Sequence, residues 1–525
     1  MLLLLASAQF LMTLDTSVMN VSISQVASDL GTTATGIQTA ITLYTLVMAA
    51  SMLTGGKIGT RIGRRRAFSI GLVIYAAGSF TTAISPNLGV LLFGWSLLEG
   101  LGAALILPAI VALVAGNFAK DRRSAAYGMI AAAAAIAVTV GPILGGAVTT
   151  IGSWRYIFAG EVVVAGVILF SARRIQDAPP EKVGRFDLLG AILSALGLAG
   201  LVLGVLQSST WGWIRPKSGT AILGLSPVVF LLAGGVVLLA LFTEHERRLA
   251  ARGGEPLVPP GLARLPQVSA GLIGFLFQFF VQAGLFFVVP VYLSIVCGLN
   301  AFQTGLRLVP LSVSLLLTAT IIPRRFKSAS PRLVVQASFL CCFVGTLVFV
   351  LGVDPKSGAE IVALPMFIIG LGIGGLASQL GAVTVSGAPD DAAGEVGGLQ
   401  NTMTNLGASL GTALSGAILF SALASGLIAG VNASQALPPE VQQAATVQIS
   451  AGVSMVSDAQ LQQALAETDL SASEQQAVLD VNDAARADAV RASMIGLMVV
   501  ELLAVFATRR FPRRPVASAP STATA

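Results

Sequence analysis

Residues 55–66 read GGKIGTRIGRRR and carry five of the 31 lysines and arginines of the chain. Long apolar runs flank this stretch on both sides, at residues 37–54 and 67–84. Cations gathered in a short loop between two membrane-spanning runs are typical of a cytoplasmic loop. Glycine allows tight turns and close helix contacts. We therefore expect a compact basic loop at the cytoplasmic ends of two membrane helices.

The composition extends this interpretation to the whole chain. Of 525 residues, 55% are apolar and only 11% are charged, and the mean hydropathy is +0.84. Soluble domains carry about 25% charged residues. The apolar residues form continuous runs of roughly 18–25, which is the length that crosses a membrane as a helix. A β-barrel would show shorter segments of alternating polarity. We predict an all-α polytopic membrane protein.

Fourteen runs are candidates for membrane spans. They cover roughly residues 1–26, 37–54, 67–84, 88–116, 124–148, 156–172, 187–206, 222–243, 268–296, 304–322, 333–352, 361–386, 394–428 and 490–508. Because fourteen is even, both termini should lie on one side. With both termini in the cytoplasm, 24 lysines and arginines fall on the cytoplasmic side and 7 on the outer side. This bias is what the positive-inside rule predicts, and one missed span would invert it for all later segments.

The segment 430–489 stands outside this pattern. It is rich in Ala, Gln, Ser and acids and holds no aromatic residue and no His. We expect an outer loop that is either a water-exposed helical hairpin or partly disordered.

The basic loop resembles a signature of the major facilitator superfamily, G-x-L-A-D-R-x-G-R-K-x. Gly56, Arg61, Gly63 and Arg64 match that signature, whereas Thr60 stands where the signature has Asp. Since Thr60 lacks the carboxylate, we expect the latch between helices at this loop to be weaker than in the family or to use other partners.

A second resemblance lies at residues 141–146, which read GPILGG. Gly141, Pro142, Gly145 and Gly146 are similar to the antiporter motif in the fifth helix of this superfamily. Residues 14–21, LDTSVMNV, resemble the first-helix motif of its fourteen-span drug/proton antiporter branch. Proline bends a helix and small residues permit close crossing. Such a helix can seal two halves that rock against each other.

The resemblance implies two six-helix halves with two extra central helices, 14 transmembrane helices in all, and alternating access around a midplane site. We expect an N-terminal half at residues 1–175, the extra helices and a cytoplasmic linker at 176–265, a C-terminal half at 266–515, and a disordered tail at 516–525. The implied function is proton-coupled export (antiport) of hydrophobic or cationic drug-like compounds. The implied setting is a bacterial inner membrane, with the protein as a monomer and the proton gradient as its energy source.

Four acids lie inside the predicted spans, away from the span ends. They are Asp15, Glu99, Glu161 and Glu501. An acid at the bilayer centre costs about 2.5–3.5 kcal/mol, so each one needs a reason. An antiporter needs at least one carboxyl that alternately binds a proton and a cation. We predict proton coupling at the first three, whereas Glu501 can face the lipid or the extra helices. A buried acid held by a structural partner is the alternative for each.

The fourth helix departs from the family pattern at two positions. Ser96 stands where the family usually has Arg, and Glu99 stands where it usually has Gln. One cation is therefore lost and one acid is added a turn away. We hypothesise that the proton relay is centred on Glu99 and coupled to Asp15.

Polar residues on apolar helices are candidates for a substrate cavity. Gln278 and Gln282 lie four residues apart and share one helical face, next to Phe279 in a phenylalanine-rich span. A greasy cavity with a few polar groups suits amphipathic substrates. Asn20 and Tyr44 are further candidates. Lipid-facing packing is an equal alternative for any single phenylalanine.

Other classes of function have little support in the sequence. We find no phosphate-binding Walker loop and no nucleophile–His constellation, which argues against an ATP-driven pump and an enzyme. The adjacent Cys341 and Cys342 are a poor metal pair, so we expect neither metal nor cofactor, and no nucleic-acid partner. Export of one endogenous metabolite, lipid or siderophore remains an alternative. So does a non-transporting membrane sensor or assembly factor.

Overall fold

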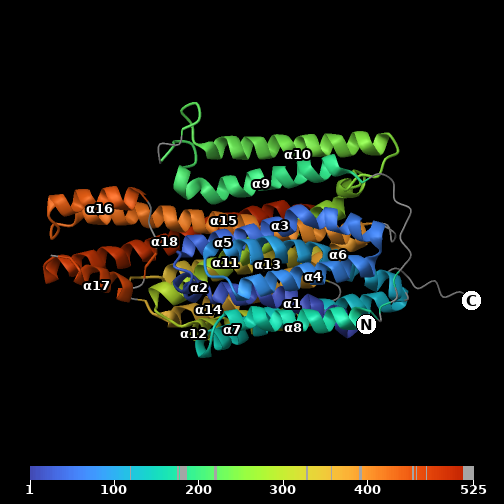
Figure 1. Ribbon diagram of the computed structural model, residues 1–525, viewed down its shortest axis with the longest axis horizontal. Helices are drawn as coiled ribbons and strands as arrows, with labels where there is room; N and C mark the ends of the chain where they lie inside the picture. The colour runs from blue at the N-terminus through green and yellow to red at the C-terminus, as the bar shows by residue number, and fades with distance from the viewer. Residues whose placement is uncertain are drawn as a thin grey trace, which may run out of the picture.

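The computed structural model describes residues 1–118, 120–173, 175, 177, 186–217, 221–326, 329–355, 357–388, 393–451, 455–456, 458–468 and 470–511. In this part the chain is a bundle of long helices with nearly parallel axes (Figure 1). The N-terminus lies at one end of the bundle, called here the termini end. Helices α16 and α17 project from the opposite end, called here the hairpin end.

The first group of helices follows from the N-terminus. It comprises α1 (Leu2–Val21), α2 (Ile23–Asp29), α3 (Ala34–Ile62), α4 (Arg64–Ala83), α5 (Leu88–Leu91), a π-helical segment (Leu92–Glu99), α6 (Gly100–Asn117), α7 (Lys120–Ile151) and α8 (Arg155–Ala172). Of these, α1, α3, α4, α6, α7 and α8 are the long helices that pack with one another.

Two helices then precede a second group. They are α9 (Leu188–Trp211) and α10 (Pro227–Ala251). The second group comprises α11 (Pro266–Val291) with a π-helical turn (Tyr292–Val296), α12 (Ala301–Arg325), α13 (Pro331–Gly352), α14 (Ala363–Ser386), α15 (Ala393–Ala433), α16 (Pro439–Ala451), α17 (Asp458–Ala466) and α18 (Ala472–Ala507). Short 3-10 turns lie at Leu262–Arg264, Ala359–Val362 and Thr508–Arg510.

Within the described residues, thirteen helices are long and apolar enough to cross a membrane. The long helix outside that set is α4, with 20 residues, whose first turn is Arg64–Arg66. The prediction of an all-α polytopic membrane protein is confirmed.

The two groups of helices meet along two seams. α3 packs along α15, and α7 packs along α12. At the first seam Gln38 donates to the carbonyl oxygens of Thr412 and Ala413 at 3.0 and 3.2 Å. α9 lies over the α3–α15 seam and touches both groups, whereas α10 packs on the outside of α9 (Figure 1). Helices α9 and α10 therefore cover one junction between the groups.

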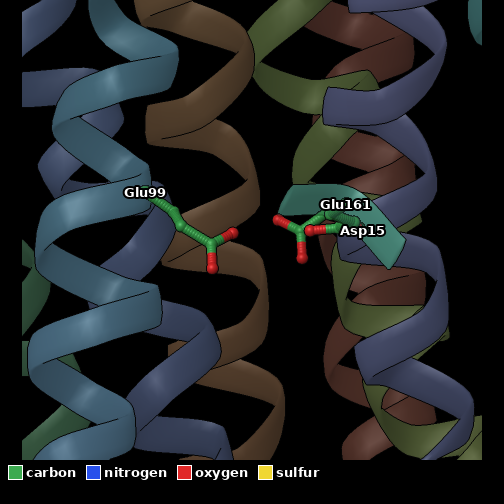
Figure 2. A group of neighbouring side chains, drawn as sticks. All are labelled: Asp15, Glu99 and Glu161. Carbon is green, nitrogen blue, oxygen red and sulfur yellow. The ribbon is translucent and has the colours of Figure 1, made fainter. Parts of the chain in front are cut away.

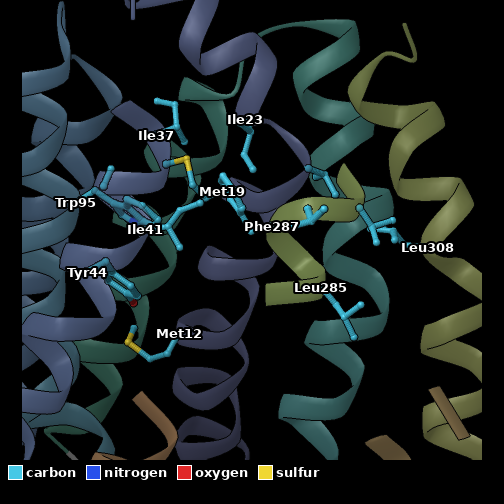
Figure 3. Close-up of a cluster of buried hydrophobic side chains, with 14 of the residues drawn as sticks. Met12, Met19, Ile23, Ile37, Ile41, Tyr44, Trp95, Leu285, Phe287 and Leu308 are labelled. Carbon is cyan, nitrogen blue, oxygen red and sulfur yellow. The ribbon is translucent and has the colours of Figure 1, made fainter. Parts of the chain in front are cut away.

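The largest core cluster runs through both groups. It contains side chains of α1 and α3, such as Met12, Met19 and Tyr44, and continues into α11 and α12 with Phe287 and Leu308 (Figure 3). Apolar side chains of α1 and α3 thus pack with those of α11 and α12 and hold the two groups together.

The predicted outer segment 430–489 is helical where it is described. α15 has 41 residues and α18 has 36, which is more than the ~20 that cross a membrane. Both continue past the bundle at the hairpin end, where α16 and α17 lie between them in the chain (Figure 1). Ser471 caps α18 through a reciprocal pair of hydrogen bonds with Glu474. The expected tail at 516–525 lies outside the described residues.

Candidate functional site

Three of the predicted acids come together in the first group of helices. Asp15 of α1, Glu99 at the end of the π-helical segment and Glu161 of α8 are fully buried, with 0%, 0% and 2% of their surface exposed. One carboxylate oxygen of each lies within 4.8 Å of the other two. Figure 2 shows the side chain of Glu99 pointing across a gap toward Asp15 and Glu161. These residues are far apart in sequence and form one site, called here the three-acid site.

Each acid accepts hydrogen bonds from neutral side chains. Trp95 donates its indole N–H to both oxygens of Asp15, at 2.9 and 3.1 Å. Tyr75 and Ser79 of α4 donate to Glu161 Oε2 at 2.9 and 3.2 Å.

Glu99 is held more loosely than the other two acids. Thr82 donates to Glu99 Oε1 at 3.2 Å. Glu99 Oε2 and Glu161 Oε1 have no hydrogen-bond partner among the described residues. Every donor shown on the three acids is uncharged, and among the described residues no ion pair involves them. Burying carboxylates without a cation is costly, so protons or a bound cation would stabilise the site.

The local backbone brings Glu99 and Trp95 to this position. Both lie in the π-helical segment Leu92–Glu99. This geometry is rare in proteins as a whole, and where it occurs it is often at a functional site. Gly78 of α4 faces this segment, and a Cβ placed there would come within 2.6 Å of Glu99 Cγ. Close contact between α4 and the π-helical segment thus depends on a glycine at position 78.

The Trp95 side chain is held by ring stacking in addition to its hydrogen bonds with Asp15. Its ring lies on that of Tyr44, with centroids 4.8 Å apart and planes at 3° (Figure 3). Ser96, which stands where the family usually has Arg, donates to the carbonyl oxygen of Ala40 at 2.8 Å. That position therefore ties the helix to α3 instead of supplying a charge.

The predicted substrate residues are spread over different helices. Asn20 is buried and donates to the carbonyl oxygen of Thr16 in its own helix. On α11, Gln278 is buried, Gln282 and Phe279 are half-buried, and the ring of Phe279 stacks on Phe275 at 6.5 Å. Among the described residues, no hydrogen bond joins the two glutamines to Asn20 or Tyr44. Their shared cavity stays a prediction.

Two surface cavities lie elsewhere. One, of about 450 Å³, is lined by Arg65, Arg66, Ser69, Ile70 and Arg173. The other, of about 290 Å³, lies between α12, α13 and α14 and is lined by residues that include Phe326, Cys341 and Leu371. Both belong to the termini end of the bundle.

The glycines of α7 make the close contacts that the sequence predicts. A Cβ on Gly141 would lie 2.5 Å from Ser17 Cβ, and one on Gly145 would lie 2.8 Å from Val18 on the same helix, α1. Gly146 faces α12, where a Cβ would lie 2.4 Å from the carbonyl oxygen of Ala301.

Helix α12 returns a glycine contact to α7. A Cβ on Gly305 would lie 2.1 Å from the carbonyl oxygen of Pro142. Helix α7 is therefore pressed between α1, which carries Asp15, and α12 of the other group.

The basic loop uses other partners than the signature carboxylate. Thr60 donates back to the carbonyl oxygen of Gly56 at 3.2 Å. Asp177, which follows α8, accepts from the backbone N–H of Arg65 at 3.0 Å, next to Gly63 with its φ of 100°. A positive φ favours glycine.

A salt bridge at this loop spans the two groups of helices. Lys57 of α3 lies 3.5 Å from Glu395 of α15. Arg61, also in the loop, is exposed to solvent. This ion pair joins the two groups without the carboxylate that Thr60 replaces, and its role as a latch stays a prediction.

Sequence reasoning missed the donors around the acids. Trp95, Tyr75, Ser79 and Thr82 were not singled out, although Trp95 precedes Glu99 by one helical turn. It also missed a small polar cluster at the start of α9. There His245 Nε2 lies 2.8 Å from Asp187 Oδ1, which also accepts from the N–H of Gly190.

The sequence suggested that Glu501 faces the lipid or the extra helices, but in the structure it faces neither. It is fully buried on α18 and accepts a hydrogen bond from Thr346 of α13 at 2.9 Å. It lies in the second group of helices and is not part of the three-acid site.

Comparison with known proteins agrees with this architecture. The model of the Major Facilitator Superfamily matches residues 5–412. The cephamycin export protein CmcT of Amycolatopsis lactamdurans is 31% identical over 77% of this chain and 82% of its own length. The tetracenomycin C resistance and export protein of Streptomyces glaucescens is 28% identical over 77% of this chain and 73% of its own.

A solved structure shows the same fold at low sequence identity. The inward-facing, occupied form of a bacterial homolog of the human lysosomal transporter Spinster gives a TM-score of 0.58 at 13% identity, covering 97% of this chain and 96% of that one. With the family model matching most of the sequence, and with relatives that are export and resistance proteins, the chain belongs to the Major Facilitator Superfamily of membrane transporters.

Proposed function

We propose that this protein is a proton-coupled exporter of hydrophobic or cationic drug-like compounds, working as an antiporter by alternating access. The observation that carries the proposal is the three-acid site, where three buried carboxyls share one space and have only neutral hydrogen-bond donors. Such a site can hold protons in one state and release them in another, when the groups of helices move. The relatives named as antibiotic export and resistance proteins support export of a small molecule.

The two groups of helices are the proposed rocking halves. They meet along two seams, α3 with α15 and α7 with α12, and the second seam has close backbone approaches at Gly146 and Gly305. α4 is the proposed fourteenth span, because its 20 residues lie packed between α6 and α8 like the other long helices. With α4 counted, we propose that the chain belongs to the fourteen-span branch, with both termini in the cytoplasm of a bacterial inner membrane.

Export of a single endogenous compound is the second candidate. The names of the relatives that export cephamycin or tetracenomycin C refer to one compound each. A narrow substrate profile would favour this alternative over drug-like compounds in general.

Efflux from cells that express the protein tests the proposal. A panel of hydrophobic and cationic dyes, ethidium among them, is followed with and without an uncoupler of the proton gradient. We expect export of part of the panel that stops with the uncoupler and in a Glu99→Gln variant. The matched control is Asp480→Asn, which removes an exposed acid of α18 and should leave efflux unchanged. Normal, uncoupler-sensitive efflux by the Glu99→Gln variant would refute the role of the site.

A further inference from the structure

Glu501 is a buried carboxyl that the three-acid site does not use. It lies in the membrane part of α18, where its surface exposure is 0%. Thr346 of α13 donates to Oε1 at 2.9 Å, and Oε2 has no partner among the described residues. Its neighbours in sequence, Leu502 and Leu503, are exposed on the outside of the bundle. The Glu501 side chain therefore lies on the face of α18 that points into the bundle.

Among the described residues, no ion pair involves Glu501. α18 packs mainly against α11, α13 and α15, and it also contacts α17, the π-helical turn Tyr292–Val296 and the 3-10 turn Thr508–Arg510. α11 has no charged residue, and the charged residues of α13 and α15 are Arg332 and Glu395, near the starts of those helices. The titratable group that α13 brings to the same level is Cys342, fully buried one turn before Thr346. The nearest cation along the chain is Arg509, eight residues away in the 3-10 turn after α18, and its side chain is exposed. Toward the hairpin end the nearest cation is Arg491, ten residues away, or about 15 Å along the helix.

Glu501 repeats the placement of Glu161. Each acid lies on the sixth long helix of its group, α8 in the first and α18 in the second. Each accepts hydroxyl hydrogen bonds from the third long helix, which is α4 for Glu161 and α13 for Glu501. The same helix pair thus holds a buried acid in both groups, although only the first group adds Asp15 and Glu99.

We propose that Glu501 is a second proton-binding site, in the second group of helices, so that the protein binds and releases protons at two separate places. The proposal rests on the proposed proton-coupled export. The bound proton sits on Oε2, which has no other partner, while Oε1 keeps the contact with Thr346. A carboxyl that is protonated on Oε2 can still accept through Oε1, so the Thr346 hydroxyl donates to Oε1 in both forms. One proton is added or removed, and no other bond changes.

Infrared difference spectra of the full-length protein in lipid, recorded between acid and alkaline pH, test the proposal. A protonated carboxyl has a C=O band that an ionised one lacks. We expect Glu501→Gln to remove one pH-dependent carboxyl band, and Thr346→Val to shift that band. A triple variant, Asp15→Asn with Glu99→Gln and Glu161→Gln, should keep it. Asp480→Asn, on the exposed part of α18, is the control that should leave it in place.

Two results would overturn the proposal. If Glu501→Gln removes no band from the difference spectrum, Glu501 keeps one protonation state over the whole pH range and the acid is structural. If the band that Glu501→Gln removes is also lost in the triple variant, Glu501 is not a separate second site. Failure of the proposed function gives a different result, since ethidium efflux by the unmodified protein would then be absent or insensitive to the uncoupler, whatever the spectra show.

Discussion

Reversing the charges of the Lys57–Glu395 pair should open the termini end of the protein. The pair joins α3 to α15 at 3.5 Å, with side chains 22% and 40% exposed. At that exposure, solvent screens the pair, and its contribution is about 0.2–1 kcal/mol. Lys57→Glu replaces the attraction by a repulsion of similar size. The single variant should therefore shift the balance of closed to open forms by about 0.4–2 kcal/mol, or roughly 2- to 30-fold.

Labelling of a cysteine at position 53 measures this shift. Leu53 is partly buried against Val396 and Leu399 of α15, in the same junction as the salt bridge. In a background without the three native cysteines, a water-soluble maleimide should react faster with Leu53→Cys when that end opens. We expect Lys57→Glu and Glu395→Lys each to raise the rate within the range above. High salt should shrink the difference.

The double variant decides whether the pair itself is responsible. Lys57→Glu combined with Glu395→Lys restores opposite charges and should return labelling to about the original rate. Rates in the single variants equal to those of the unmodified pair would refute a latch at this place. Equal acceleration in the single and double variants would show that the effect comes from some other contact.

Three further predictions follow from the site and its surroundings. Trp95→Phe removes both hydrogen bonds to Asp15, and we expect it to abolish dye efflux while membrane expression and thermal unfolding change little. Gly305→Ala sets a methyl group against the carbonyl oxygen of Pro142; overpacking of this kind costs about 1–3 kcal/mol, so it should lower the unfolding temperature and slow efflux, and equal rates for both proteins would contradict the close seam. Asp187→Ala should lower the unfolding temperature, because it removes a carboxylate that is stabilised in the folded protein. Burial alone would raise the pKa of Asp187. Hydrogen bonds from the Gly190 N–H and from His245 outweigh burial and hold that pKa below its ordinary value. That stabilisation is full above the unfolded pKa of about 3.9 and is lost as pH falls through the lower folded pKa, so thermal scans should show the gap between variant and parent narrow only below about pH 4; a gap that persists there would contradict it.

Much of the fold could be predicted because a membrane imposes simple rules. Hydrocarbon demands long apolar helices, so the spans could be located from residue order alone, and the helical outer segment at 430–489 was one of two expected forms. The cations at 57–66 and the glycines at 141–146 marked the family because loop charge and close helix crossing are local properties of the sequence.

The partners in the site could not be predicted for a physical reason. Asp15, Glu99 and Glu161 each looked expensive in a membrane helix, and that cost singled them out one by one. Their meeting within 4.8 Å depends on the packing of α1, α8 and the π-helical segment, which involves residues far apart in the chain. Glu501 illustrates the same limit, since its burial against α13 is set by helix rotation and not by its own sequence neighbourhood.

Proton movement against substrate is the most direct test of the central claim. The purified full-length protein is placed in liposomes that enclose a pH-sensitive dye. No pH gradient is imposed, and an ethidium gradient is applied across the membrane. The account predicts that ethidium moving down its gradient drives protons in the opposite direction, and that the proton signal disappears in the Glu99→Gln variant while the Asp480→Asn variant keeps it. Ethidium transport with no accompanying proton movement would contradict the account.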